Sequence, residues 1–165
     1  MAAREVLNWP DPRLSQRCVK VGDTDVSALV GDLLDTMYAA GGRGLAAPQI
    51  GAMVRVFVAD TGWKEGASAP RVCIDPEIVA ASDRTVAFTE SCLSIPGISA
   101  EVTRPAEVTI RYRDAAGGIR TEILNGIDAV VVQHELDHLD GIVTFDRVDP
   151  ALRAELLEIY AGSAA

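Results

Sequence analysis

The stretch NGIDAVVVQHELDHLDG, residues 125–141, decides how this chain folds, and the rest of the sequence is interpreted around it. Asn125 and Asp128 stand three residues apart, which is the spacing of a helix cap, and a largely apolar run follows. Gly141 stands where such a helix would end, because glycine readily adopts the left-handed conformation that closes helices. The pattern predicts one helix that carries the letters HELDH in its last turns.

HELDH matches the H-E-x-x-H pattern of metal-binding helices. Residues four apart lie about 40° apart around a helix axis, so the imidazoles of His134 and His138 can share one ion, with Glu135 beside it as a base. The chain has no other histidine. The same helix face carries three apolar residues, namely Ile127, Val130 and Val131. Histidines that continue an apolar face would be buried without evident partners unless a metal uses their nitrogens, so the pattern predicts a metal site.

A catalytic site of this kind needs a third protein ligand and an open position for water. The metzincin class would require a histidine where this chain has Thr144, so that class is excluded. A gluzincin would use a glutamate on a later helix, but Glu155 and Glu158 are better interpreted as solvated surface charges. Cys92 remains. A thiolate beside two imidazoles is a donor set suited to Fe, Zn, Co or Ni.

Two other roles for Cys92 are disfavoured. The three cysteines, Cys18, Cys73 and Cys92, are an odd number far apart in the sequence, and the N-terminus lacks the apolar run of a signal peptide. Reduced thiols in a cytosol-like compartment are therefore expected rather than a disulfide. As a nucleophile Cys92 would need a free histidine as its base, yet both histidines are committed by the helix motif.

Composition limits the remaining possibilities. At 165 residues the chain fits one domain, spanning residues 1–165, that can bury a core without staples. No window approaches the roughly 20 apolar residues of a membrane span, so we expect a cytoplasmic protein with no membrane attachment. The net charge of −9 and the absence of any Lys/Arg cluster argue against a nucleic-acid partner.

The remaining elements are predicted from periodicity. Apolar residues at helical spacing predict a helix within residues 24–42, and Asp149 with Pro150 predicts the start of a final helix. Strands are predicted at 54–59, 71–75, 84–89, 107–113 and 119–124, with a glycine-rich loop at 41–51. Helices at both ends and strands grouped between them predict an α+β fold rather than alternating βαβ units.

Three blocks, in this order, resemble the peptide deformylase family: GRGLAAPQ at Gly42–Gln49, ESCLS at Glu90–Ser94 and QHELDH at Gln133–His138. Their joint occurrence is far more specific than H-E-x-x-H alone. The resemblance implies a small α+β domain with a central metal helix. It also implies an enzyme that removes the N-formyl group from nascent peptides beginning with formylmethionine, near the ribosome. We expect a monomer, although the sequence leaves the oligomeric state open.

The resemblance also implies the roles of individual residues. The metal ligands are Cys92, His134 and His138, the general acid/base is Glu135, and the oxyanion donors are the side-chain amide of Gln49 and the backbone N–H of Leu93. One divalent ion is implied, Fe²⁺ in the first place, with Zn²⁺, Ni²⁺ or Co²⁺ as substitutes. The metal lowers the pKa of its water toward about 7, so that hydroxide attacks the formyl carbon while Glu135 transfers the proton to the leaving amine.

The substrate would lie as an added strand between the glycine block and the cysteine block. The methionine side chain needs an apolar slot, for which Ile127, Val130, Val131 and Phe88 are candidates. The predicted substrate-contacting residues in these two segments are Arg43, Gly44, Leu45, Glu90 and Ser91. In the family's layout Glu90 pairs with an arginine, for which Arg104 is well placed as structural support.

Two positions depart from the family's usual pattern. Ser91 stands where the family has glycine, and Arg43 stands where it has an apolar residue. If the backbone at residue 91 required a positive φ, Ser91 would be strained by roughly 1–2 kcal/mol. Arg43 would place a flexible positive charge at the rim. Besides a housekeeping deformylase, the sequence therefore leaves open a paralogue with a shifted substrate preference, an H-E-x-x-H peptidase and a non-catalytic relative.

Overall fold

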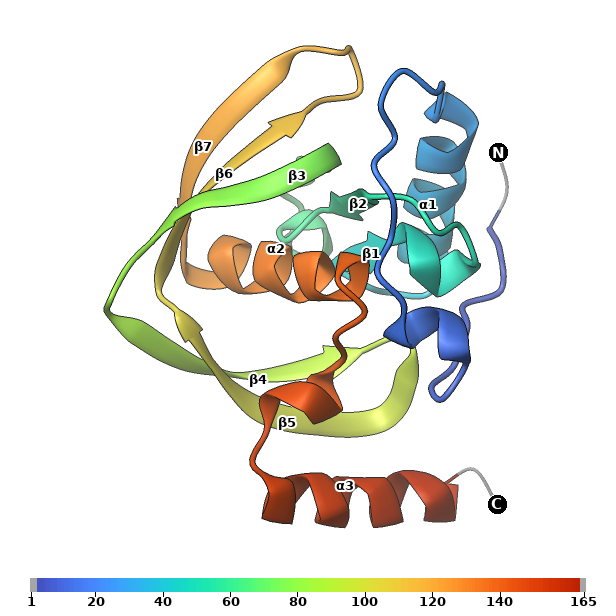
Figure 1. Cartoon of the computed structure of the whole chain (residues 1–165), viewed down its shortest axis with the longest axis vertical. Helices are drawn as coiled ribbons and strands as arrows, with labels where there is room; N and C mark the ends of the chain where they lie inside the picture. The colour runs from blue at the N-terminus through green and yellow to red at the C-terminus, as the bar shows by residue number, and fades with distance from the viewer. Residues whose placement is uncertain (1–2, 164–165) are drawn as a thin grey trace.

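The computed structural model describes residues 3–163, and the HELDH helix runs through the middle of them (Figure 1). This helix is α2, Gly126–Leu139, with α1 at Ser27–Ala39 and α3 at Pro150–Ser163. The strands are β1 Gly44–Ala46, β2 Val56–Ala59, β3 Arg71–Ala81, β4 Thr85–Cys92, β5 Ile95–Pro105, β6 Glu107–Arg113 and β7 Ile119–Asn125. Short 3₁₀ turns lie at Pro12–Ser15 (η1), Ala47–Ile50 (η2), Trp63–Glu65 (η3) and Thr144–Arg147 (η4).

Two antiparallel sheets enclose α2. The larger has the strand order β1-β2-β3-β6-β7, and the smaller is the hairpin β4-β5. In Figure 1, α2 lies between the strands of the larger sheet and the hairpin, α1 lies beside β1 and β2, and α3 lies beyond β5. The α+β fold predicted from the sequence is confirmed by this arrangement. Because β1 and β4 each have one strand neighbour, each keeps a free edge.

The core keeps α2 in place. One cluster packs its residues Val132, Leu136 and Leu139 against Phe57 and Tyr112 of the larger sheet. Apolar area removed from water stabilises such packing by roughly 25 cal/mol per Å², so a helix with its apolar residues covered in this way is a firm base for a site. Separate clusters attach α1 to β2, and α3 to β5 and η4.

The N-terminal end of α2 differs from the predicted helix cap, whereas its C-terminal end agrees with the prediction. Asn125 is the N-cap residue, but its side chain makes no capping hydrogen bond. Asp128 instead accepts a 2.5 Å hydrogen bond from the Thr61 hydroxyl, which ties the first turn to a neighbouring loop. Gly141 ends the helix as predicted, with φ of +75°. A Cβ at Gly141 would also lie 2.8 Å from the backbone of Ser15, so the position needs glycine for space as well as for conformation.

Two strands were not predicted. Residues 41–51 were expected to form a loop, but Gly44–Ala46 form the edge strand β1, which pairs with β2. β5 was missed because Pro96 and Gly97 suggested a stop, and in the structure Gly97 has φ of +81° at the start of the strand. The period of a half-buried strand was nevertheless present beyond it, because alternate residues are buried at Ile98, Ala100, Val102 and Arg104.

Candidate metal centre

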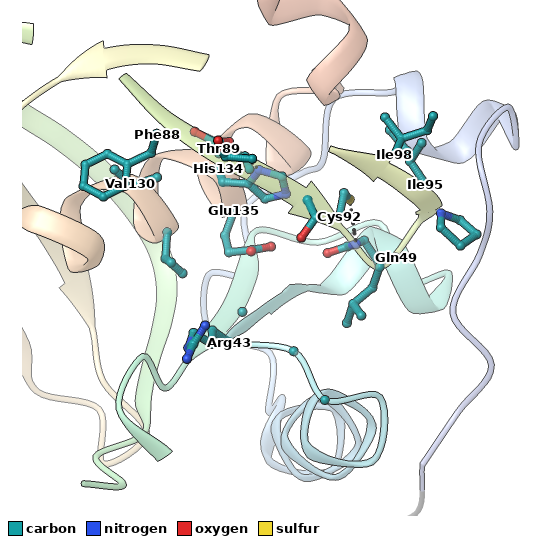
Figure 2. Close-up of a pocket in the computed structure, with 18 of the residues that line it drawn as sticks. Arg43, Gln49, Phe88, Thr89, Cys92, Ile95, Ile98, Val130, His134 and Glu135 are labelled. Atoms are coloured by element: carbon teal, nitrogen blue, oxygen red, sulfur yellow. Dashed lines mark hydrogen bonds and ion pairs between the residues drawn. The ribbon is translucent and has the colours of Figure 1, made fainter. Parts of the chain in front are cut away.

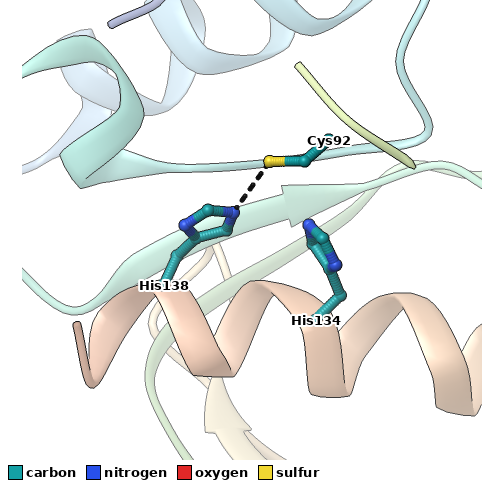
Figure 3. Close-up of side chains that lie close together, drawn as sticks. All are labelled: Cys92, His134 and His138. Carbon is teal, nitrogen blue, oxygen red and sulfur yellow. Dashed lines mark hydrogen bonds between the residues drawn. The ribbon is translucent and has the colours of Figure 1, made fainter. Parts of the chain in front are cut away.

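Cys92, His134 and His138 come together although His134 lies 42 positions after the cysteine in the sequence. Their ligand atoms all lie within 4.8 Å of one another, and the Cys92 Sγ lies 3.3 Å from the His138 Nε2. Figure 3 shows both imidazoles projecting from α2 toward Cys92, which is the last residue of β4. One sulfur and two imidazole nitrogens are a donor set that binds Zn²⁺ or Fe²⁺ well, so these residues fit a divalent metal.

The ring of His134 is held from behind by a buried carboxylate. Its Nδ1 lies 3.0 Å from the Glu90 Oε1, which leaves the other ring nitrogen for the ligand cluster. Glu90 is in turn gripped by Arg104, through Nε at 2.6 Å and Nη2 at 2.9 Å. Both side chains of this pair are 5% exposed. A second group that orients a metal-binding histidine is a regular feature of metal sites, and the sequence anticipated both residues.

The same network continues to two residues that the sequence analysis missed. Arg104 also donates a 2.9 Å hydrogen bond from Nη1 to Asp137, and Arg147 from η4 binds both oxygens of Asp137. Asp137 lies inside the HELDH letters, where the pattern leaves its position unspecified. The contact of Asp137 with Arg104 depends on where the β4-β5 hairpin packs against α2, which the helix spacing alone does not give.

Burial and charge shift the pKa values of the two histidines in opposite directions. Burial opposes protonation of His134, but hydrogen bonds to Cys92 and Glu90 outweigh it and raise its pKa well above the ordinary value. Burial, the neighbouring His134 and Arg104 together lower the pKa of His138.

Glu135 is buried beside the cluster, and its Oε1 has no hydrogen-bond partner among the described residues. Burial is the main reason that its pKa is raised to about 7. Gly44 of β1 allows this carboxylate to approach, since a Cβ there would lie 2.5 Å from the Glu135 Oε2. An unpartnered buried carboxylate with this pKa is suited to taking and returning a proton near neutral pH.

Gln49 lies in η2, directly after β1, and is 2% exposed. Its Oε1 accepts a 2.9 Å hydrogen bond from the Ala46 N–H, which fixes the amide so that the Nε2 points at Ser94 Oγ (3.0 Å) and Cys92 Sγ (3.7 Å). Ser94 is a contact that the sequence analysis did not single out. The predicted donor amide of Gln49 therefore lies beside the metal cluster with its orientation fixed.

A cavity of about 420 Å³ opens next to this cluster (Figure 2). Its walls include the predicted apolar residues Phe88, Ile127, Val130 and Val131, and Leu93 and Gln49 also line it. Ile95 and Ile98 of β5 line it as well and were missed along with their strand. Leu45 is the exception among the predicted contacts. Its side chain is fully buried in the cluster around α1, on the side of β1 away from the cavity.

The two unusual residues also line the cavity. Among the described non-glycine residues only Asp75 has a positive φ, so Ser91 is not strained in the way considered above. Ser91 is exposed and pairs with Ser99 across the hairpin.

The Arg43 side chain is held by two contacts, although the sequence had suggested a free side chain. Its Nε donates to the Thr61 carbonyl at 3.1 Å, and its Nη2 lies 2.5 Å from the Glu65 Oε1.

Comparisons with known proteins agree with this geometry. The polypeptide deformylase family model matches residues 3–154. The chain belongs to the peptide deformylase family. The peptide deformylase of Phenylobacterium zucineum is 42% identical over 160 residues, covering 96% of this chain and 95% of that protein. That of Rhodopseudomonas palustris BisA53 is 42% identical over 168 residues, covering 99% of this chain and 93% of the relative.

Solved structures of peptide deformylases have the same fold. The enzyme from Ehrlichia chaffeensis superposes with a TM-score of 0.91 at 30% identity, covering 99% of this chain and 98% of that one. A peptide deformylase from Legionella pneumophila superposes with a TM-score of 0.91 at 34% identity, covering 99% and 96%. The family predicted from the three sequence blocks, and its enzyme class of formyl-removing hydrolase, are confirmed.

The two glutamates considered as alternative metal ligands lie away from the candidate site. Glu155 and Glu158 are exposed on α3, as predicted, and neither belongs to the ligand cluster found among residues 3–163. Cys18 and Cys73 are buried free thiols, and so is Cys92.

The helices in the described part of the chain are all too short or too polar to cross a bilayer.

Proposed function

We propose that this chain removes the N-formyl group from formylmethionyl peptides and releases formate. The observation that carries the proposal is the unpartnered Glu135 carboxylate, which lies beside a Cys/His/His cluster at a cavity with an apolar wall. Family membership supports the same reaction. A peptide deformylase structure that superposes with a TM-score of 0.91 is a complex with actinonin, from Ehrlichia chaffeensis.

Cys92, His134 and His138 would hold one divalent ion, which we propose to be Fe²⁺, with Zn²⁺, Ni²⁺ or Co²⁺ as substitutes. When bound, it supplies a Lewis acid that polarises the formyl oxygen and lowers the pKa of water. The protein contributes the thiolate and the two oriented imidazoles. Glu90 keeps the His134 ring turned so that the nitrogen opposite Nδ1 faces the cluster.

The remaining steps belong to residues of the chain. Glu135 takes a proton from the attacking water and returns it to the amine that leaves, since its raised pKa suits both transfers. The Gln49 amide and the Leu93 N–H receive the charge that develops on the formyl oxygen. One such donor is typically worth roughly 3 kcal/mol of transition-state stabilisation. The apolar lining of the cavity receives the methionine side chain.

The peptide beyond the methionine would lie as a strand between the free edges of β1 and β4. Glycine and serine at positions 44 and 91 both offer backbone groups on those edges, and Ser91 adopts an ordinary strand conformation. We propose that Arg43 and Ser91 shift the preference for residues after the formylmethionine. A preference profile that stays the same after Arg43→Ile and Ser91→Gly would contradict this shift.

The decisive experiment measures formate release from formyl-Met-Ala-Ser under anaerobic conditions, together with the metal content of the protein. We expect Glu135→Gln to lower kcat by roughly 10²- to 10⁴-fold, because it removes the proton carrier. Cys92→Ala should lower the metal content, whereas Glu135→Gln should retain it. Cleavage of internal peptide bonds without formate would instead identify an H-E-x-x-H peptidase, and metal binding with neither product would identify a non-catalytic relative.

The cellular setting follows from the substrate. Formylated nascent chains arise at the ribosome, so we propose a cytoplasmic enzyme that acts near it as a monomer, without binding nucleic acid directly. The charge of −9 supports the last point, because an acidic protein is repelled by RNA phosphates.

A further inference from the structure

One part of the cavity rim is built from the turn η3, which lies against the glycine loop that precedes β1. The Trp63 Nε1 donates a 2.9 Å hydrogen bond to the Gly42 carbonyl. The Trp63 ring also meets Tyr38 edge to face, with the ring centroids 5.2 Å apart. Tyr38 is itself fixed by a 2.6 Å hydrogen bond to Asp60. These contacts hold η3 at a set position relative to the glycine loop.

Three charged residues lie at this rim, and only two of them compensate each other. Arg43 forms an ion pair with Glu65 and is also bound to the Thr61 carbonyl. Lys64 lies between Trp63 and Glu65 in the sequence and lines the cavity. In the part of the chain from residue 3 to residue 163, no ion pair includes Lys64. Its Nζ lies 5.7 Å from the centroid of the Trp63 ring, a cation–π contact that restrains the ammonium and leaves its charge uncompensated.

The glycine loop gives the distance between this charge and the reacting centre. At one end a Cβ on Gly44 would lie 2.5 Å from the Glu135 carboxylate, and at the other a Cβ on Gly41 would lie 4.0 Å from the Lys64 Nζ. These glycines are three positions apart in the sequence, a stretch that spans at most about 11 Å. A substrate strand of similar rise that begins at Glu135 therefore brings its second and third residues within reach of the lysine.

We propose that Lys64 is a specificity-determining residue that binds an acidic side chain at the third position of the substrate. This inference rests on the proposed deformylase function. Glu65 tunes the subsite by neutralising Arg43, so that Lys64 alone sets the net positive charge of the rim. Arg43 also brings a positive charge to the rim, but Glu65 pairs with it, so Lys64 supplies the uncompensated charge there.

The effect on the reaction is modest and electrostatic. A charge pair at a solvent-exposed rim contributes little and is screened by salt. We expect kcat/KM for formyl-Met-Ala-Glu-amide to exceed that for formyl-Met-Ala-Gln-amide by roughly two- to fivefold at low salt. The ratio between these two peptides, which differ only in charge, should fall toward one at high salt.

Three variants test the assignment. Lys64→Glu should invert the ratio, so that the glutamine peptide becomes the better substrate. Glu65→Gln should raise the ratio, because it releases the charge of Arg43. Lys20→Glu is the matched control, since Lys20 is the other lysine of the chain, is exposed and does not line the cavity. It changes the net charge equally and should retain the wild-type ratio.

The outcomes separate this proposal from the function on which it rests. A ratio near one in the wild type, or the same ratio in Lys64→Glu and in Lys20→Glu, overturns the role of Lys64 and leaves deformylation intact. Formate release from neither peptide, by the metal-loaded wild-type protein, overturns the proposed function itself. An acidic preference that Lys64→Glu inverts, and that Lys20→Glu leaves in place, supports the proposal.

Discussion

Two arginine–glutamate pairs flank the same cavity and have opposite surroundings. Arg104 and Glu90 are each 5% exposed, whereas Arg43 is 36% and Glu65 is 59% exposed. The inner pair holds the His134 ring and extends to Asp137. Arg43 and Glu65 pair with each other at the rim, where water competes for the hydrogen bonds of both side chains. An arginine–glutamate ion pair therefore fixes the His134 ring at the buried end of the cavity, whereas at the exposed end it only changes the net charge of the rim.

The difference arises from desolvation. Taking two charges out of water is costly, and a buried pair is maintained only when its remaining hydrogen-bonding atoms are satisfied. Arg104 meets this demand with three hydrogen bonds to Glu90 and Asp137. Losing one partner there leaves an uncompensated buried charge, whereas the same loss at the rim exposes a charge that water already solvates.

The largest effect is expected from Arg104→Met. It leaves the Glu90 carboxylate buried without its cation, so we expect the free energy of unfolding to fall by about 3–5 kcal/mol in urea denaturation. Arg111→Met is the matched control, because Arg111 pairs with Glu77 at an exposed site and should cost below about 1 kcal/mol. Equal losses in the two variants would show that burial does not distinguish these pairs.

Gly44→Ala should follow, through geometry rather than charge. The added Cβ would lie 2.5 Å from the Glu135 Oε2 and 3.0 Å from the Val131 Cγ1, so the carboxylate must move. Displacing a reacting group by about 1 Å can cost roughly 100-fold, and we expect a loss in kcat of that order in the formate assay. Gly162→Ala, where a Cβ meets nothing within 4 Å, should keep wild-type activity. If both variants behaved alike, the close approach of β1 to Glu135 would be irrelevant to the reaction.

The sequence predicted the inner end of the cavity better than the rim. His134, Glu135 and His138 lie in one motif whose spacing on a helix is set by 3.6 residues per turn, and Cys92 lies in a second short motif. Glu90 and Arg104 could be paired in advance from the family resemblance. Asp137 and Arg147 could not, because their contact depends on how the hairpin and η4 pack against α2.

The strand β5 and the contacts of Arg43 at the rim were missed for a different reason. Proline and glycine at positions 96 and 97 are strong local signals of a turn, and they outweighed the period-two burial that follows them. Arg43 was expected to be free, because nothing local marks Glu65, 22 residues later, as its partner. Local patterns specify elements and motifs, while contacts between loops follow only from the assembled fold.

Glu90→Gln should have a smaller effect than the loss of Arg104, because the amide keeps the size of the side chain and removes only its charge. We expect metal affinity to fall by 10- to 100-fold, as for other groups that orient a metal-binding histidine. Competition with a chelator for Co²⁺ or Zn²⁺ measures this without an activity assay. Glu77→Gln, on an exposed residue, should leave the affinity unchanged. An affinity that survives Glu90→Gln would restrict the role of Glu90 to folding.

The smallest effect is expected at the outer pair. A double-mutant cycle with Arg43→Met and Glu65→Gln isolates the coupling between the two side chains, provided that each single change removes only their interaction. At these exposures we expect a coupling below about 1 kcal/mol, and less at 0.5 M salt than at 0.05 M, since screening acts on exposed charges. Urea unfolding of the four proteins gives the value. A coupling of 3 kcal/mol or more, insensitive to salt, would place this pair with Arg104 and Glu90, and the contrast between the two ends of the cavity would disappear.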